Sequence, residues 1–223
     1  MSNRRESRVR GRSIAAGLAG FGLLVAAAAP ASATTLRKMD LPELVATADR
    51  IVDARAVDSV VYWDADGLQI FTDTTFEVIS EAKGQGPATL VVSLLGGRIG
   101  EADMQAEGAP IFSIGDEVVL FALDRGDGKN NLVGYTQGVM RVVDEAAPNS
   151  TTVKMAVSEV PLGVTYVQSV AGQAVEVRPS PMRAPLDTLL TDIRGMIGGT
   201  RPPGPSVSTT PETDPIVPGS EIQ

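Results

Sequence analysis

The segment Leu68–Ala82 (LQIFTDTTFEVISEA) constrains the fold of this chain more than any other. Apolar, β-branched and aromatic residues alternate along it with polar ones, which is the pattern of a half-buried β-strand. A straight strand of this length would extend roughly 50 Å at about 3.3 Å per residue, well beyond the usual ~17–20 Å. We therefore expect the strand to bend near Thr72–Thr75, as strands of small, strongly coiled barrels do.

The N-terminus has the features of an export signal. Arginines between Arg4 and Arg12 precede an apolar run, Ile14–Ala29, and Ala31-Ser32-Ala33 has the small-x-small pattern of a cleavage site. The run is shorter than the ~20 residues that span a bilayer, which argues against an uncleaved anchor. We predict a Sec signal peptide over 1–33, cleaved between Ala33 and Thr34, and a periplasmic or extracellular product with no membrane attachment.

The charge of the mature chain argues against nucleic acid as a partner. The whole chain has 19 basic and 27 acidic side chains, and residues 1–33 hold five arginines and one glutamate, so 14 and 26 remain, a net charge of −12. Phosphate backbones are bound by clusters of Lys and Arg. Residues 201–223 are rich in Pro, Ser and Thr and predict a disordered tail. A single domain is expected over 34–200.

Periodicity predicts a mainly β fold between two helices. A short helix is expected after Asp40, which can cap its first turn, and a second helix over Pro185–Ile197. The expected strands are 51–63, 68–82, one from Leu90 to Gly96-Gly97, 118–123, 132–143, and a hairpin of 164–170 with 173–177. A loop is expected over Arg98–Ile114. We predict a small OB-like antiparallel barrel with a short N-terminal helix and a C-terminal capping helix.

The absence of two residue types excludes much chemistry. The chain contains no histidine and no cysteine. Ser-His-Asp and Cys-His nucleophilic sites and His- or Cys-ligated metal sites therefore cannot form. No glycine-rich nucleotide-binding motif occurs between a strand and a helix. General acid–base chemistry by carboxylates stays open. We expect no cofactor and no enzymatic activity.

Three short motifs have alternative interpretations. Asp64-Ala65-Asp66-Gly67 partly matches a calcium loop, but Leu68 stands where a third oxygen ligand is needed, so we favour a plain turn. Arg125-Gly126-Asp127 matches an adhesion tripeptide, and we attribute it to chance in a turn-rich loop. Asn149-Ser150-Thr151 has the form of a glycosylation sequon, which matters only in a glycosylating export pathway.

Four residues are candidates for a contact surface. Trp63 stands beside the first turn, Tyr135 and Gln137 lie on the predicted fifth strand, and Arg98 follows two glycines in the predicted loop. Aromatic residues near the loop ends of a barrel recur in ligand grooves. The alternative is that the aromatic residues pack in the core or at the barrel end.

Several short segments together resemble a family of uncharacterised exported bacterial proteins. The resemblance covers about residues 40–143 and is carried by Leu41–Val52 (LPELVATADRIV), Thr72–Val78 (TDTTFEV), Lys83-Gly84, Gly96-Gly97-Arg98, Gly108–Phe112, Gly115–Phe121 and Gly134–Gly138. The order of elements is also distantly similar to the netrin-like domain of tissue inhibitors of metalloproteinases, an OB-type barrel. Those inhibitors chelate zinc through an N-terminal cysteine. Thr34 takes that place here, so the mechanism does not carry over.

From these observations we predict an exported, monomeric, non-enzymatic binding module whose partner is a protein or a glycan outside the cytoplasm. Trp63, Arg98, Tyr135 and Gln137 would form its contact surface. One alternative is a regulator of a secreted protease that inserts the 98–114 loop into the peptidase cleft. A carboxylate-based hydrolase is the third possibility, and it requires two buried acids that face each other in a cleft.

Overall fold

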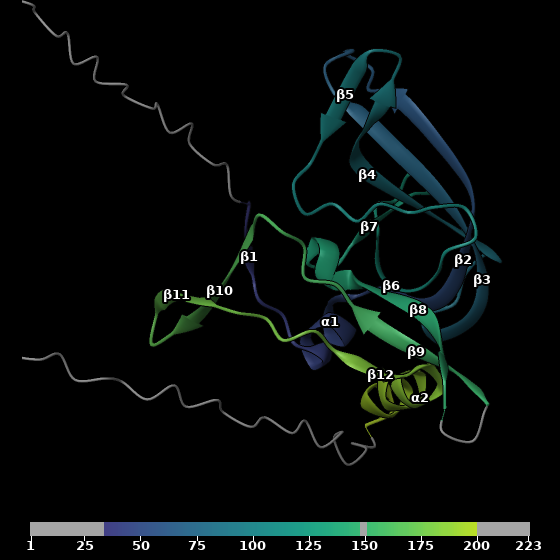
Figure 1. Cartoon of the computed structure of the whole chain (residues 1–223), viewed down its shortest axis with the longest axis vertical. Helices are drawn as coiled ribbons and strands as arrows, with labels where there is room; N and C mark the ends of the chain where they lie inside the picture. Colours follow the sequence, from purple (N-terminus) through teal and green to yellow (C-terminus); the bar gives the residue numbers. More distant parts are fainter. Residues whose placement is uncertain (1–33, 148–150, 200–223) are drawn as a thin grey trace, which may run out of the picture. The chain divides into compact units, whose positions relative to one another are not determined.

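The computed structural model describes residues 34–147 and 151–199 (Figure 1). It is mainly β-sheet with two helices, as the sequence predicts. The predicted signal peptide with Ala33, the C-terminal tail, and Asn149 and Ser150 of the sequon lie outside the described residues.

The first helix forms where its capping residue predicts. After the short strand β1 (Thr34–Arg37), α1 (Leu41–Thr47) begins with the backbone amide of Glu43 donating to Asp40 Oδ1 at 2.9 Å. At the other end of α1, Lys83 Nζ donates to the carbonyl oxygen of Val45 at 2.7 Å. Side chains therefore form hydrogen bonds with free backbone groups at both ends of this short helix.

The long strand of the sequence is present and pairs along almost its whole length. It is β3 (Ile70–Lys83), antiparallel to β2 (Arg50–Trp63), and Figure 1 shows both strands curving. The register shifts three times, and one shift, between Ala56 and Asp58, lies opposite Phe76 and Thr75. An extra residue on one strand of a pair bends the ribbon. This irregularity adjoins the corner predicted at Thr72–Thr75.

The remaining strands extend this pair on both sides. They are β4 (Thr89–Ile99), β5 (Ala102–Gln105), β6 (Glu117–Asp124), β7 (Asn130–Leu132), β8 (Val139–Ala146), β9 (Thr152–Ser158) and β12 (Arg183–Pro185). The order is β12-β9-β8-β6-β2-β3-β4-β5, and β7 pairs with both β4 and β6. The pairings of β2, β3, β4, β7 and β6 thus run in a ring. One residue pair, Val92 with Asn130, joins β4 to β7, so the barrel is not cleanly closed.

Three sequence predictions are wrong in this sheet. The strand expected over 132–143 is interrupted by a 3₁₀ turn, η1 (Tyr135–Gly138), because Gly134 and Tyr135 adopt left-handed φ angles of 58° and 62°. The third strand does not end at Gly96-Gly97 but continues to Ile99. The expected 98–114 loop therefore contains the end of β4 and all of β5.

A second, smaller sheet contains β1, β10 (Val164–Val170) and β11 (Gln173–Val177). The β10–β11 hairpin is confirmed at its predicted bounds. Strand β1 runs parallel to β10, from Thr34 opposite Val164 to Arg37 opposite Val167. No feature of the sequence analysis predicted that pairing.

Two buried clusters lie on opposite faces of β2 and β6. Val52, Ala54, Val118 and Leu120 face the interior of the ring, where Phe76 is fully buried. Ile51, Val119 and Phe121 belong to the other cluster with α1 and α2 (Leu186–Ile197). The C-terminal helix therefore covers the outside of the ring, as predicted for a capping element.

Candidate functional site

A cleft of about 490 Å³ opens between the β4–β5 hairpin and the loop that follows it. Thr72 and Thr74 of β3 and the paired segments 94–98 of β4 and 103–105 of β5 border it. The loop 106–112 and Leu162 complete the border. We call this hollow the β4–β5 cleft. Its volume lies within the range of small-molecule and side-chain pockets in proteins.

Two glycines of β4, Gly96 and Gly97, allow close packing at the border of the β4–β5 cleft. Gly97 has a φ of +140°, and a Cβ on it would come within 2.6 Å of Val61 Cγ1 and 2.7 Å of Thr72 Oγ1. Thr72 Oγ1 donates to the carbonyl oxygen of Gly96 at 2.6 Å. Side chains of β2 and β3 therefore fill the space where a Cβ of Gly97 would lie, and the hydrogen bond from Thr72 fixes the backbone of β4 against β3.

Arg141 of β8 holds the loop 106–112 in place. Its Nη2 donates to the carbonyl oxygen of Ile111 at 2.6 Å, and its Nη1 pairs with Asp116 at 2.7 Å. Next to Ile111, the ring of Phe112 meets the buried ring of Phe76 edge to face, with centroids 5.0 Å apart. The loop is thus anchored by the Phe112–Phe76 ring contact and by the hydrogen bond from Arg141 to Ile111.

The mouth of the β4–β5 cleft carries exposed apolar side chains. Ile111 is 78% exposed and Leu162 is 97% exposed, and both border the cleft. Isolated exposed apolar side chains are common, but two of them beside one preformed hollow indicate a contact surface.

Of the four predicted contact residues, only Arg98 borders the β4–β5 cleft. Its Nη2 pairs with Asp103 Oδ2 at 2.8 Å across the β4–β5 hairpin. Trp63 is 42% exposed at the end of β2, where it pairs with Ile70, but it does not border the cleft.

Tyr135 and Gln137 have structural roles instead. Gln137 Oε1 accepts from the backbone amide of Met39 at 2.8 Å, and Gln137 Nε2 donates to the carbonyl oxygen of Arg37 at 2.9 Å. Tyr135 occupies the left-handed position that starts η1, and burial raises the pKa of its hydroxyl. Gln137 therefore bonds the N-terminal segment of its own chain, and the shared contact surface of the four residues stays a prediction.

The sequence analysis missed a buried carboxylate on β2. Asp53 is 4% exposed, and its Oδ1 has no hydrogen-bond partner among the residues that the structure describes. Burial, and then the charge of Glu117, raise the pKa of Asp53 to about 6, while Lys154 and Arg55 oppose the rise. Ser80, the residue paired with Asp53 across β2 and β3, also has an unpartnered buried hydroxyl. Alternation places Asp53 on the face of β2 opposite Val52 and Ala54, and tertiary packing buries that face as well.

Glu117 lies near Asp53 but in a different environment. Burial would raise the pKa of Glu117, but hydrogen bonds from Lys154 and Arg55 outweigh that effect and lower the pKa. Glu117, with Arg55 and Lys154, borders a second hollow of about 440 Å³, whereas Asp53 does not border it. A carboxylate-based hydrolase needs two carboxylates that face each other in a cleft. Asp53 and Glu117 do not face each other across that hollow.

A second missed cluster, formed by Tyr62, Asp73, Ser93 and Lys129, fixes the loop before β7. Lys129 Nζ contacts Asp73 Oδ2 at 2.7 Å and donates to the hydroxyl of Tyr62 at 2.9 Å. Burial would raise the pKa of Asp73, but hydrogen bonds from Lys129, Ser93 and Tyr62 lower it. The hydrogen bond to Asp73 raises the pKa of Lys129, so the amine stays protonated. A protonated lysine cannot act as a base, and we assign this cluster to loop anchoring.

The short motifs behave as turns. Asp64 Oδ1 accepts from the backbone amides of Leu68 and Gln69 at 2.7 and 2.9 Å, and Arg125 pairs with Asp127 at 3.3 Å. Within residues 34–147 and 151–199, no cluster of three or more acidic residues suits a metal ion, and no helix is long and apolar enough to cross a membrane.

Comparisons with protein-family models, with curated proteins and with solved structures found no match for this chain.

Proposed function

We propose that this chain is an exported, non-enzymatic binding module whose ligand occupies the β4–β5 cleft. The observation that carries the proposal is a preformed hollow with fixed walls and an apolar mouth. Gly97 and Thr72 fix one wall, Arg141 fixes the other, and Ile111 and Leu162 lie exposed at the mouth. Ligand sites are concave, mostly apolar and largely preformed.

We also propose that the ring of β2, β3, β4, β7 and β6 is an OB-type barrel. OB-folds are partly open five-stranded barrels that bind ligands on their second and third strands and the adjoining loops. In this ring the second and third strands are β3 and β4, and both border the β4–β5 cleft. The netrin-like resemblance, which implies the same kind of barrel, stays a prediction.

A methyl NMR titration tests the binding proposal. Purified protein labelled at Met and Ile methyl groups would be titrated with short apolar peptides and with chitohexaose. We expect shifts at Met104 and Ile111, which border the β4–β5 cleft, and none at Met155 or Ile193, which lie beside and within α2. Ile111→Asp should weaken binding at least tenfold, because it places a charge where apolar contact is expected. Equal shifts at all four methyl groups, or no shifts with either probe, would contradict the proposal.

Regulation of a secreted protease is a second candidate function. It is favoured by Ile111 and Ile114, which are 78% and 61% exposed on a loop that Arg141 anchors. Loops that inhibit proteases are held rigid before binding. Assays of secreted serine and metalloproteases with the purified protein would test it, and no inhibition at micromolar concentration would count against it.

A further inference from the structure

We infer that the ligand of the β4–β5 cleft is an extended polypeptide segment that pairs with the open edge of β5 and carries basic side chains beside its apolar ones. This inference rests on the binding function proposed above and specifies the class of its ligand.

The open edge of β5 provides the backbone contacts. Strand β5 ends the strand order, and within the described part of the chain it pairs only with β4. Its other edge therefore presents backbone N–H and C=O groups that a further strand can pair with. Asp103, Met104 and Gln105 all border the β4–β5 cleft, although successive side chains of a strand point to opposite faces. A segment paired with β5 would therefore lie beside the cleft.

The lining of the β4–β5 cleft suits a peptide better than a sugar. Sugar rings are bound by stacking on exposed aromatic faces and by several polar side chains. Among the described residues Phe112 is the one aromatic residue that borders the cleft, and its ring already packs against Phe76. Leu94, Met104 and Pro110 provide aliphatic surface for an apolar side chain. A polypeptide partner is therefore favoured over a glycan.

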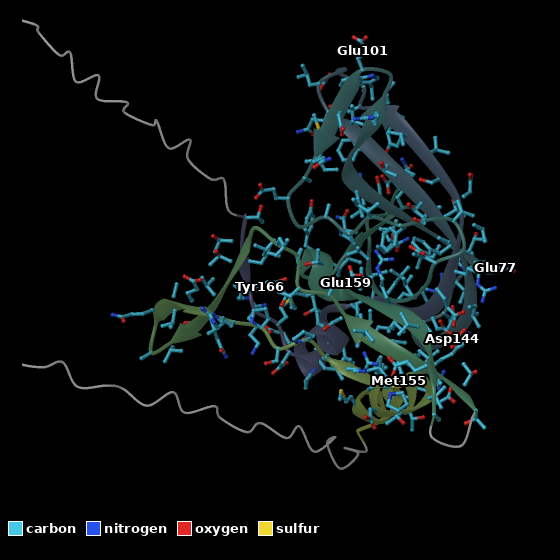
Figure 2. All side chains as sticks on the ribbon, in the orientation of Figure 1. Glu77, Glu101, Asp144, Met155, Glu159 and Tyr166 are labelled. Atoms are coloured by element: carbon cyan, nitrogen blue, oxygen red, sulfur yellow. The ribbon has the colours of Figure 1, made fainter. Side chains whose placement is uncertain are left out.

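The charge at the rim of the β4–β5 cleft favours basic residues in the ligand. Three ionised side chains border it, and two of them, Arg98 and Asp103, neutralise each other at 2.8 Å. The third, Glu107, is exposed and makes no ion pair with any residue in the described ranges. Glu101, at the tip of the β4–β5 hairpin in Figure 2, does not border the cleft. A ligand with Lys or Arg next to its apolar side chain would complement this charge.

Two peptides and two matched variants test the charge. The probes are Ac-SKVKLKVS-NH2 and Ac-SEVELEVS-NH2, titrated in 50 mM salt while the Met104 and Ile111 methyl groups are observed. We expect the lysine peptide to bind wild-type protein at least tenfold more tightly than the glutamate peptide. Glu107→Lys should reduce that preference to threefold or less, whereas Glu101→Lys, which changes the net charge equally, should leave it within twofold. If both variants reduce the preference equally, overall charge is responsible and the inference fails.

N-methylated peptides test the strand pairing. In an extended peptide the amides of the two valines and the leucine face one edge, and those of the lysines face the other. One lysine peptide would be N-methylated at the valines and the leucine, and a second at the lysines. We expect one of them to lose at least tenfold in affinity and the other to bind within threefold of the parent. Equal affinity of both would overturn pairing with β5.

The outcomes separate this inference from the proposed function. If chitohexaose or the glutamate peptide shifts the Met104 and Ile111 methyl groups more than the lysine peptide does, the β4–β5 cleft is a binding site but its ligand class is wrong. If no probe shifts either methyl group, both the function and the inference fail.

Discussion

Asp53 is the residue whose ionisation is most altered by the fold. Its unfolded-state pKa is close to 3.8, and burial raises the folded-state pKa to about 6. Between these values the folded protein binds more protons than the unfolded chain, so the free energy of unfolding falls as pH rises through this window. A difference of about two pKa units corresponds to about 3 kcal/mol. Above pH 6 the contribution of this residue is constant.

Asp53→Asn removes this ionisation and should change the pH dependence of stability. We expect the stability of the variant relative to wild type to increase by up to about 3 kcal/mol from pH 4 to pH 7, because only the wild type must ionise a buried acid. Urea unfolding at pH steps between 4 and 7.5 measures the difference.

Asp58→Asn provides the control for Asp53→Asn. Asp58 lies on the same strand with an exposed side chain. Its substitution is a surface change that should alter the free energy of unfolding by no more than about 0.5 kcal/mol. Parallel pH curves for wild type and Asp53→Asn would show that Asp53 titrates normally in the folded protein.

Among the elements, η1 decides how the N-terminal segment is held. Gln137 bonds the amide of Met39 and the carbonyl oxygen of Arg37, so one side chain links η1 to the segment between β1 and α1. Strand β1 otherwise relies on its four-residue pairing with β10. Short strands with few buried side chains open easily.

Gln137→Ala should therefore loosen β1 more than it affects the large sheet. We expect a loss of about 1–3 kcal/mol in unfolding free energy, because the amide of Met39 is left without its partner. Hydrogen exchange should become faster at Met39 and along β1 and stay unchanged in β2. Gln168→Ala, on the exposed part of β10, is the matched control and should change neither quantity. Equal exchange rates in both variants would mean that Gln137 does not secure β1.

At the scale of the whole molecule, the two buried clusters share their strands. Successive residues of β2, Ile51 and Val52, belong to different clusters, and so do Val119 and Leu120 of β6. If β2 or β6 unfolds, buried side chains of both clusters are exposed. Large-to-small substitutions at buried positions typically cost 2–5 kcal/mol.

Phe76→Ala in the ring and Leu189→Ala under α2 should therefore destabilise one common unfolding transition. Phe76 is 0% exposed and Leu189 is 2% exposed, and they lie in separate clusters. We expect each variant to unfold in a single step, with a loss of about 3–5 kcal/mol for Phe76→Ala and about 2–5 kcal/mol for Leu189→Ala. Differential scanning calorimetry measures this. A separate low-temperature transition in either variant would mean that the clusters unfold independently.

The elements with local sequence signals were predictable from the sequence. Alternation over 68–82 marked the long strand, Asp40 marked the start of α1, and leucine spacing marked α2, since each pattern reflects one face against one core. The same alternation over 152–158, with Val153, Met155 and Val157 on one face, would have marked β9. The break between β7 and β8 was missed because Tyr135 takes a left-handed conformation that its residue type does not favour.

The candidate site was decided by the tertiary structure. Arg98 was identified from its two glycines, but its position beside Asp103 depends on a hairpin whose turn the sequence analysis took for part of a loop. Arg141 and Ile111, which shape the β4–β5 cleft, lie on separate elements and meet only after the sheet has curved. Periodicity reports which face of an element is buried. Which elements share that face is set by non-local strand pairing, and a single-residue junction such as Val92 with Asn130 leaves no repeating pattern in the sequence.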